Sequence, residues 1–283
     1  MNPAPSDPRD IAAALNAAGA LVLVIDFDGT LSTIVRRPED ASLVDCAANA
    51  IARVASEIPV AISSGRGLDD LMARVGSDLP VIFIGGHGSI VRQRDGAVTE
   101  LVDTLPASEA LDELALQLQR IVADRDGWQI ERKPTSIAAH YRRADDSITA
   151  AVLPEVRATM RDHQARPPGF ELLDGKSVVE LRARAADKGR ALSHLMRQFP
   201  GRIPVAIGDD VTDEDAFAAA VDLSGFGVIV GPATHPTHAT WRLDNPAAVV
   251  TLLDALEAEQ ATSSTRWDNA VGTQPVPPAP RGT

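Results

Sequence analysis

Two apolar segments of the chain end in aspartates. Residues 21–30 read LVLVIDFDGT, and residues 205–217 read VAIGDDVTDEDAF. If the first segment is a strand, Asp26 and Asp28 point to the same side. Carboxylates this close favour a shared cation, and Mg²⁺ prefers such oxygen ligands. The competing interpretation is an exposed Asp-Gly turn, but the aliphatic residues before it favour a buried strand.

The second acidic segment supplies further metal ligands. Asp209 follows an apolar run, so we expect it to bind the metal directly. Asp213 is expected to lie behind the direct metal ligands or to bind the metal through a water molecule. The acidic residues at 213–215 also suit the first turn of a helix capped by Thr212, which explains them without a metal.

Two other segments offer contacts to an anion. SSGR (63–66) follows an apolar run and precedes a predicted helix, where hydroxyls and backbone N–H groups bind phosphate. Ser64 is the predicted phosphate contact, and Arg66 is predicted to be structural or close to the substrate. Lys188 opens a helix, which is unfavourable unless it reaches an anion such as phosphate or a nucleophilic carboxylate. In isolation these patterns also fit a plain loop and a solvated lysine.

The elements that must position these residues alternate between strand and helix, which predicts an α/β fold with a parallel sheet. Ligands bind such sheets at the carboxyl ends of the strands. The predicted elements are helices at 11–18, 43–56, 68–75, 187–197, 213–220 and 246–259, strands at 21–25, 59–66, 80–88, 204–210 and 226–230, and a hairpin at 88–101.

The middle of the chain follows another pattern. Helices at 111–123 and 148–160 are each followed by two strands, which predicts an inserted α+β cap of order αββαββ. The predicted domains are a core at 9–103 and 184–259, a cap at 104–183, and disordered Pro-rich ends at 1–8 and 260–283. Hinges for cap movement are expected near 103–107 and 181–187.

The composition excludes several classes of protein. The 283 residues carry a formal net charge of -12, which disfavours nucleic acid and anionic membranes as partners. No apolar run approaches the length of a membrane span, and the N-terminus does not resemble a signal peptide. The single cysteine, Cys46, is expected to be an apolar helix residue. It allows no internal disulfide and fits a reducing, cytoplasmic location.

Four short motifs along the chain resemble, in sequence and in order, those of the haloacid dehalogenase (HAD) superfamily of phosphoryl-transfer enzymes. The resemblance implies a Rossmann-like core in which Asp26 attacks phosphorus and forms an aspartyl-phosphate. It implies that Asp28 first protonates the leaving oxygen and then activates water. Asp26, the carbonyl of Asp28 and Asp209 would hold Mg²⁺, while Ser64 and Lys188 would clamp the phosphoryl group. The motifs are DFDGTL (26–31), SSGR (63–66), DKG (187–189) and GDDVTDED (208–215).

Within that superfamily the chain resembles the trehalose-6-phosphate phosphatases over about residues 15–258. It departs at Ala183, where the family often has proline. The resemblance implies hydrolysis of a small sugar phosphate, trehalose 6-phosphate, supplied by a trehalose-phosphate synthase of the same pathway. The segments that carry it are SSGR (63–66), GGHGS (85–89), HYR (140–142), GKSVVELR (175–182) and GDDVTDEDAF (208–217).

Other functions remain open from the residues. Another sugar-phosphate phosphatase, of the sucrose-phosphate or glucosyl- or mannosyl-phosphoglycerate type, would use the same core and cap. A phosphomutase would retain the phosphoryl group. A sensor that binds sugar phosphate without turnover is disfavoured by the intact Asp26 and Asp28.

Polar residues on the predicted cap strands are candidates for sugar contacts. Alternation places Lys176 with Glu180 on one strand face and His140 with Arg142 on another. Such a face offers the donors and acceptors that sugar hydroxyls need, although His140 and Arg142 equally suit cross-strand ion pairs. The remaining predicted contacts are Lys133 and His87, and His87 also fits a plain loop.

Overall fold

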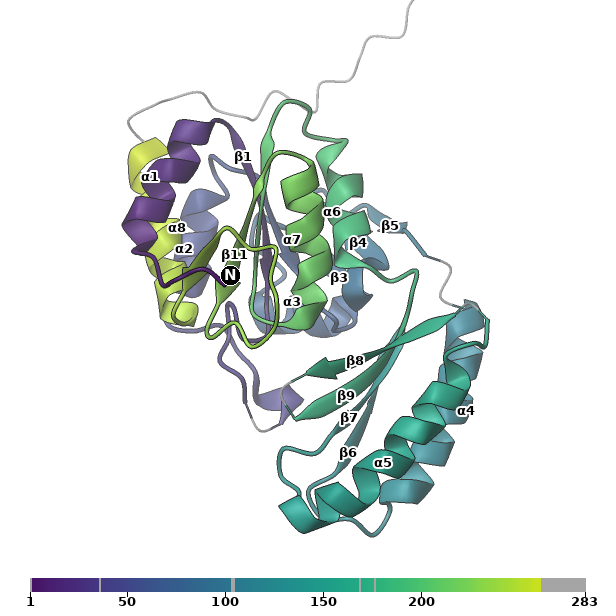
Figure 1. The fold of residues 1–283 in the computed structure, drawn as a ribbon. Coiled ribbons are helices and arrows are strands. Elements are labelled where there is room, and N and C mark those ends of the chain that lie inside the picture. Colours follow the sequence, from purple (N-terminus) through teal and green to yellow (C-terminus); the bar gives the residue numbers. More distant parts are fainter. Residues whose placement is uncertain (1, 36, 103–104, 168, 176, 261–283) are drawn as a thin grey trace, which may run out of the picture.

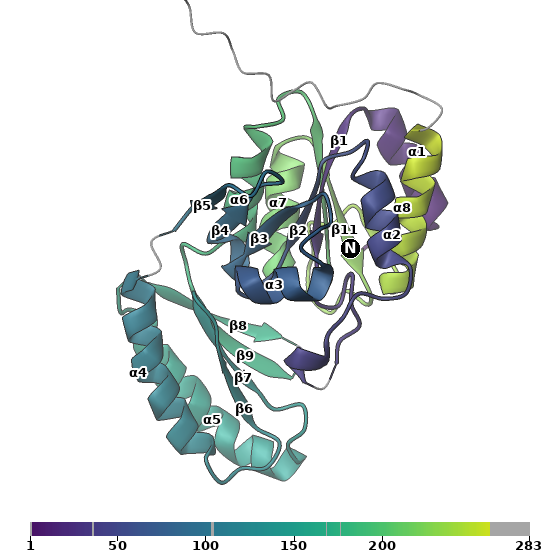
Figure 2. The ribbon, with the colours of Figure 1, turned by 180° about the vertical axis from the view of Figure 1, so that it is seen from behind.

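The computed structural model describes residues 2–35, 37–102, 105–167, 169–175 and 177–260. In this part of the chain, strands form one sheet of eight and one of four (Figures 1 and 2). The large sheet has the order β12-β11-β10-β1-β2-β3-β4-β5. Its strands are β1 Leu21–Asp26, β2 Val60–Ser63, β3 Ile82–Gly85, β4 Ile90–Arg92, β5 Val98–Glu100, β10 Ile203–Gly208, β11 Phe226–Val230 and β12 Trp241–Leu243.

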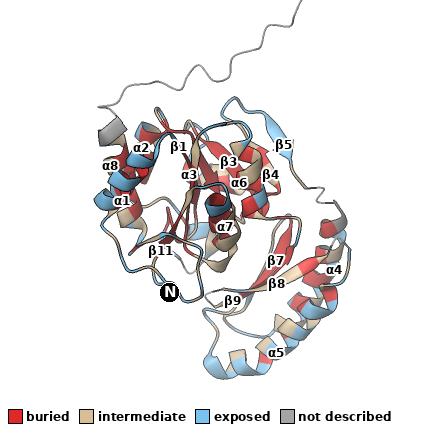
Figure 3. Cartoon of the chain, turned by 45° about the horizontal axis from the view of Figure 1, so that its top comes forward, coloured by how far each residue is buried: buried red, intermediate tan, exposed pale blue. Residues whose placement is uncertain are grey.

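The strands from β12 to β3 are parallel, and the β4–β5 hairpin completes the sheet in antiparallel fashion. Helices cover both faces, so all six residues of β1 are buried (Figure 3). Leu23 packs towards one helical layer and Val24 towards the other. The first layer contains α1 Pro8–Ala18, α2 Ala47–Val54, α3 Leu68–Val75 and α8 Pro246–Gln260, and the second contains α6 Lys188–Met196 and α7 Glu214–Asp222.

The smaller sheet is antiparallel, with the order β6-β7-β9-β8. Ile137 and Val179 pack with the two helices that cover one of its faces. The helices lie on the side of this sheet that is turned away from the core (Figure 1). The register aligns Glu131, Ala138 and Glu180 across three strands, and Glu180 contacts His87 of the core. The elements are α4 Leu105–Val122, β6 Gln129–Arg132, β7 Ser136–His140, α5 Asp146–His163, β8 Phe170–Gly175 and β9 Val178–Ala183.

The α/β core and the αββαββ cap agree with the fold class predicted from the sequence. The cap enters the chain after the β4–β5 hairpin and returns to the core at α6. None of the described helices is long and apolar enough to cross a membrane.

Several local predictions were wrong. The second helix begins at Ala47 rather than at residue 43, because Cys46 adopts a left-handed conformation (φ 65°) that a helix does not allow. Cys46 is therefore not a helix residue, and it is exposed. Thr212 does not cap the helix that follows; it lies inside a short 3₁₀ turn, Val211–Asp213, capped by Asp210. Strand β12 was not predicted at all.

Both ends of the chain were predicted to be disordered. Within the segment 1–8, expected to be disordered, the Ser6 N–H donates to the Arg242 carbonyl and Asp7 caps α1. The predicted disordered tail, 260–283, lies outside the described residues except for Gln260, which ends α8. Lys176, a predicted sugar contact, also lies outside them.

Candidate active site

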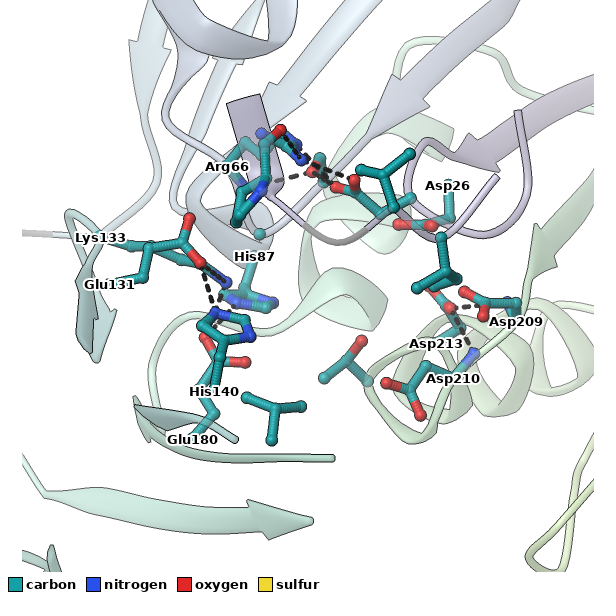
Figure 4. A pocket seen from close by; sticks show the side chains of 18 of the residues that line it. Asp26, Arg66, His87, Glu131, Lys133, His140, Glu180, Asp209, Asp210 and Asp213 are labelled. Carbon is teal, nitrogen blue, oxygen red and sulfur yellow. Dashed lines mark hydrogen bonds and ion pairs between the residues drawn. The ribbon is translucent and has the colours of Figure 1, made fainter. Parts of the chain in front are cut away.

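A cavity of about 190 Å³ lies between the carboxyl ends of the core strands and the polar face of the cap sheet (Figure 4). Apart from Lys176, all of the predicted site residues line it. These are Asp26, Asp28, Ser64, Arg66, His87, Lys133, His140, Arg142, Glu180, Lys188, Asp209 and Asp213.

A buried cluster of charges forms the core end of the cavity. Asp26 ends β1, and Lys188 begins α6 after the N-cap Asp187. The Lys188 Nζ donates to Asp26 Oδ1 at 2.6 Å and to Asp213 Oδ1 at 2.6 Å. The lysine at a helix start therefore does reach an anion, as its position predicted.

Burial and the neighbouring charges of opposite sign act in opposing directions on the pKa of Asp26 and of Lys188. Burial raises the pKa of Asp26 well above its ordinary value, and Lys188 opposes that rise. Burial alone would lower the pKa of Lys188, but Asp213 and Asp26 more than offset it, so the pKa is raised and the ammonium stays charged.

The acidic residues of the cluster fit a divalent cation. Carboxylate oxygens of Asp26, Asp209 and Asp213 lie within 4.8 Å of one another, and all three residues are buried. The backbone amides of Asp209 and Asp210 donate to Asp213 Oδ2 at 3.0 and 3.1 Å, which fixes that side chain. Three buried carboxylates, two of which share the Lys188 ammonium, favour a hard cation with oxygen ligands.

The Asp28 carboxylate lies outside this cluster, which corrects the expectation that it shares the cation site with Asp26. The reason is that β1 ends at Asp26 and the chain turns at once, with the Leu31 N–H donating to the Phe27 carbonyl. Gly29 allows the turn with φ 86°.

Asp28 instead pairs with Arg66. The guanidinium donates from Nε to Oδ2 at 2.8 Å and from Nη2 to Oδ1 at 2.7 Å. Arg66 also donates to Asp70 Oδ2 at 2.9 Å and to the Pro38 carbonyl at 3.0 Å. Ser64 is buried, and its Oγ accepts from the Arg66 N–H at 3.1 Å and lies 3.4 Å from Asp28 Oδ2. Arg66 thus joins β1, α3 and the loop before α2.

A second polar cluster occupies the cap side of the cavity. Glu180 Oε1 lies 3.0 Å from His87 Nε2, 2.5 Å from Ser136 Oγ and 3.3 Å from Lys133 Nζ. Burial would raise the pKa of Glu180, but Lys133 and His87 lower it well below its ordinary value. The carboxylate is therefore ionised at neutral pH. His140 Nε2 contacts Glu131 Oε2 at 2.8 Å, so His140 lines the cavity and forms a cross-strand pair.

The sequence reasoning missed some residues of the cavity wall. Glu131 could have been identified from the sequence, because it lies two residues before Lys133 and so on the same strand face. No sequence pattern indicated Ile34, which is 45% exposed in an irregular loop without periodicity. The lining residues that were not predicted as site residues are Ile34, Val35, Pro38, Gly65, Glu131, Ser177, Val178, Asp210 and Thr212.

The fold, an α/β core with an inserted cap, is similar to that of phosphatases of the HAD superfamily. A HAD-superfamily phosphatase from Bacteroides thetaiotaomicron has the same fold, with a TM-score of 0.53 at 18% identity, over 84% of this chain and 94% of that one. A family model for trehalose-phosphatase matches residues 24–247, and the chain belongs to this family.

Proteins named as trehalose-phosphate phosphatases are also similar to this chain. A probable trehalose-phosphate phosphatase C of Arabidopsis thaliana is 32% identical over 249 residues, which cover 83% of this chain and 76% of that protein. The C-terminal domain of Candida albicans trehalose-6-phosphate phosphatase superposes with a TM-score of 0.79 at 23% identity, covering 91% and 99% of the two chains.

Another relative is much longer than this chain. An uncharacterized glycosyl hydrolase of Mycobacterium tuberculosis is 38% identical over 246 residues. The match covers 83% of this chain but only 18% of that relative.

Proposed function

We propose that this phosphatase hydrolyses trehalose 6-phosphate with the help of Mg²⁺, through an aspartyl-phosphate intermediate. The observation that carries the proposal is the buried contact of Lys188 with Asp26 inside an acidic cluster, across one cavity from a polar cap face. One end of the cavity suits a phosphoryl group and the other suits sugar hydroxyls. Membership of the trehalose-phosphatase family supports the choice of sugar.

In the first step, a carboxylate oxygen of Asp26 attacks phosphorus. The bond from phosphorus to the sugar oxygen breaks, and Asp28, which enters this step as the neutral acid, gives that oxygen its proton. In the second step, Asp28 takes a proton from water, which attacks phosphorus, releases phosphate and restores the Asp26 carboxylate. Lys188 orients Asp26 throughout, and with Ser64 it binds the phosphoryl oxygens.

The acidic cluster would hold Mg²⁺ through Asp26 and Asp209, together with the carbonyl of Asp28. When bound, the ion would offset the negative charge of the carboxylates and the phosphoryl group. Asp213 would act behind these ligands, since it is already held by Lys188 and two backbone amides.

The cap would select the sugar. Glu180 and Glu131 offer acceptors, and Lys133, His140 and Arg142 offer donors, around the same cavity. A trehalose-phosphate synthase would then be the enzyme that supplies the substrate.

The direct test measures phosphate release from a panel of sugar phosphates with Mg²⁺. We expect kcat/KM for trehalose 6-phosphate to exceed that for glucose 6-phosphate by roughly ten-fold or more, because the second ring adds hydrogen-bonding contacts. Equal values would reject trehalose 6-phosphate as the substrate. A preference for sucrose 6-phosphate or a glycosyl-phosphoglycerate would keep the chemistry and change the sugar. Transfer to another sugar hydroxyl without phosphate release would indicate a mutase.

A further inference from the structure

His87 lies on the core, but its side chain reaches the cap. It occupies the short turn Gly86–Gly88 with φ 53° and ψ 36°, a left-handed conformation that is uncommon outside glycine. The imidazole packs over Gly65, where an added Cβ would lie 2.4 Å from ring atoms Cε1 and Nε2. Next to it, the Thr135 hydroxyl of the cap donates to the Gly86 carbonyl at 3.0 Å. The turn is therefore held from both sides.

The contact of His87 with Glu180 differs from the other contacts of that carboxylate. Lys133 and Ser136 are cap residues, so they move together with Glu180. His87 belongs to the core and meets Glu180 Oε1 at 3.0 Å (Figure 4). Because Oε1 already accepts from three donors, Oε2 is the oxygen available to a ligand in the cavity.

His87 has no ring nitrogen to offer to a sugar. Burial lowers the pKa of its imidazole, with Glu180 opposing the shift, so the ring is neutral at pH 7. A neutral ring has one N–H, and the neighbouring carboxylate places it on Nε2. The Nδ1 atom is buried and has no hydrogen-bond partner among the described residues.

We propose that His87 is a positioning residue: it orients the Glu180 carboxylate from the core side, so that Glu180 is ready for the sugar only when the cap is closed. This role rests on the proposed function, in which Glu180 contacts the sugar. It differs from the sugar contact that the sequence predicted for His87, since the imidazole acts through Glu180.

Two substitutions separate the hydrogen bond from the backbone conformation. Asparagine tolerates the left-handed conformation, but its amide is too short to reach Glu180. Glutamine places an N–H near the position of Nε2. We expect His87→Asn to lower kcat/KM for trehalose 6-phosphate by roughly ten- to a hundred-fold, mainly through KM, because a hydrogen bond to a charged group is lost. His87→Gln should recover most of this loss.

Turnover of p-nitrophenyl phosphate provides the control, since this small ester does not need the sugar contacts. This turnover should stay within about two-fold of wild type in His87→Asn, because the substitution leaves the catalytic residues of the core in place. An equal loss on both esters would overturn the proposal and show that His87 supports the core as a whole.

A double-mutant cycle with Glu180→Ala completes the test. If His87 acts through Glu180, His87→Asn should cause no further loss in that background. Full additivity would overturn the proposal and indicate a direct contact with the sugar. If wild type hydrolyses p-nitrophenyl phosphate but not trehalose 6-phosphate, the proposed substrate fails. The cycle is then measured on the sugar phosphate that the panel favours, where the same two outcomes decide the role of His87.

Discussion

At the scale of single residues, Asp26 is a buried carboxyl group, and burial raises its pKa well above its ordinary value. Replacing it by asparagine keeps its shape and removes both the nucleophile and a group that is costly to ionise. We expect Asp26→Asn to lower turnover by at least about a thousand-fold without lowering the midpoint of thermal unfolding. Phosphate release and thermal unfolding measure the two effects. The exposed Asp10→Asn in α1 is the matched control and should behave like wild type.

Retained turnover in Asp26→Asn would reject Asp26 as the nucleophile. A large fall in its thermal midpoint would instead show that the charge stabilises the fold through Lys188.

The metal site makes a prediction that does not depend on activity. A ligand that binds only the folded protein raises its thermal midpoint. We therefore expect Mg²⁺ to raise the midpoint of wild type, and Asp209→Asn to abolish most of that rise. Asp210→Asn is the control, because the Asp210 carboxylate lies outside the three-residue acidic cluster. An equal rise in all three proteins would place the ion elsewhere.

At the scale of elements, Arg66 ties a strand end to a helix and a loop. Lysine cannot reproduce the paired hydrogen bonds to Asp28 while also contacting Asp70 and the Pro38 carbonyl. We expect Arg66→Lys to lower kcat by roughly ten- to a hundred-fold for both trehalose 6-phosphate and p-nitrophenyl phosphate, since Asp28 serves every substrate. Steady-state kinetics on the two esters measure this.

Arg74→Lys is the matched control for Arg66. Arg74 also pairs with Asp70 and donates to backbone carbonyls of the same loop, but it does not contact Asp28 among its described bonds. A loss as large as that of Arg66→Lys would mean that the loop, rather than Asp28, limits turnover.

The buried strands were predictable because β1 and β10 are short apolar runs that end in acidic residues. The same pattern indicated the edge where Asp26 and Asp209 meet. Strand β12 has three residues at the edge of the sheet, too few for a periodic signal. The position of Asp28 could not be predicted, because it depends on Arg66, a partner 38 residues away in the chain.

At the scale of the whole molecule, the contact between core and cap is sensitive to acid. The pKa of His87 is lowered in the folded state, so the unfolded chain binds protons more readily below about pH 6.5. The pKa of Glu180 is also lowered, so its contribution is present above about pH 4.3 and is lost as the pH falls further. Both shifts make the free energy of unfolding fall with decreasing pH.

We expect urea denaturation to show this fall in two ranges, one beginning near pH 6.5 and one below about pH 4.3. His87→Gln should reduce the first, and Glu180→Gln should reduce the second. His238→Gln is the control for the first range, because His238 is exposed and lies outside the contact between core and cap. A pH profile that neither His87→Gln nor Glu180→Gln changes would show that other groups dominate the acid response.

The insertion of the cap also sets an order for biosynthesis. Strand β1 lies between β2 and β10, and α1 packs with α8 in the same core. As the chain leaves the ribosome, all strands of the cap sheet emerge before β10 does. The cap is therefore able to complete its own sheet while the first half of the core still has an open strand edge at β1. Until β10 arrives, that edge is the part of the nascent chain most in need of a chaperone.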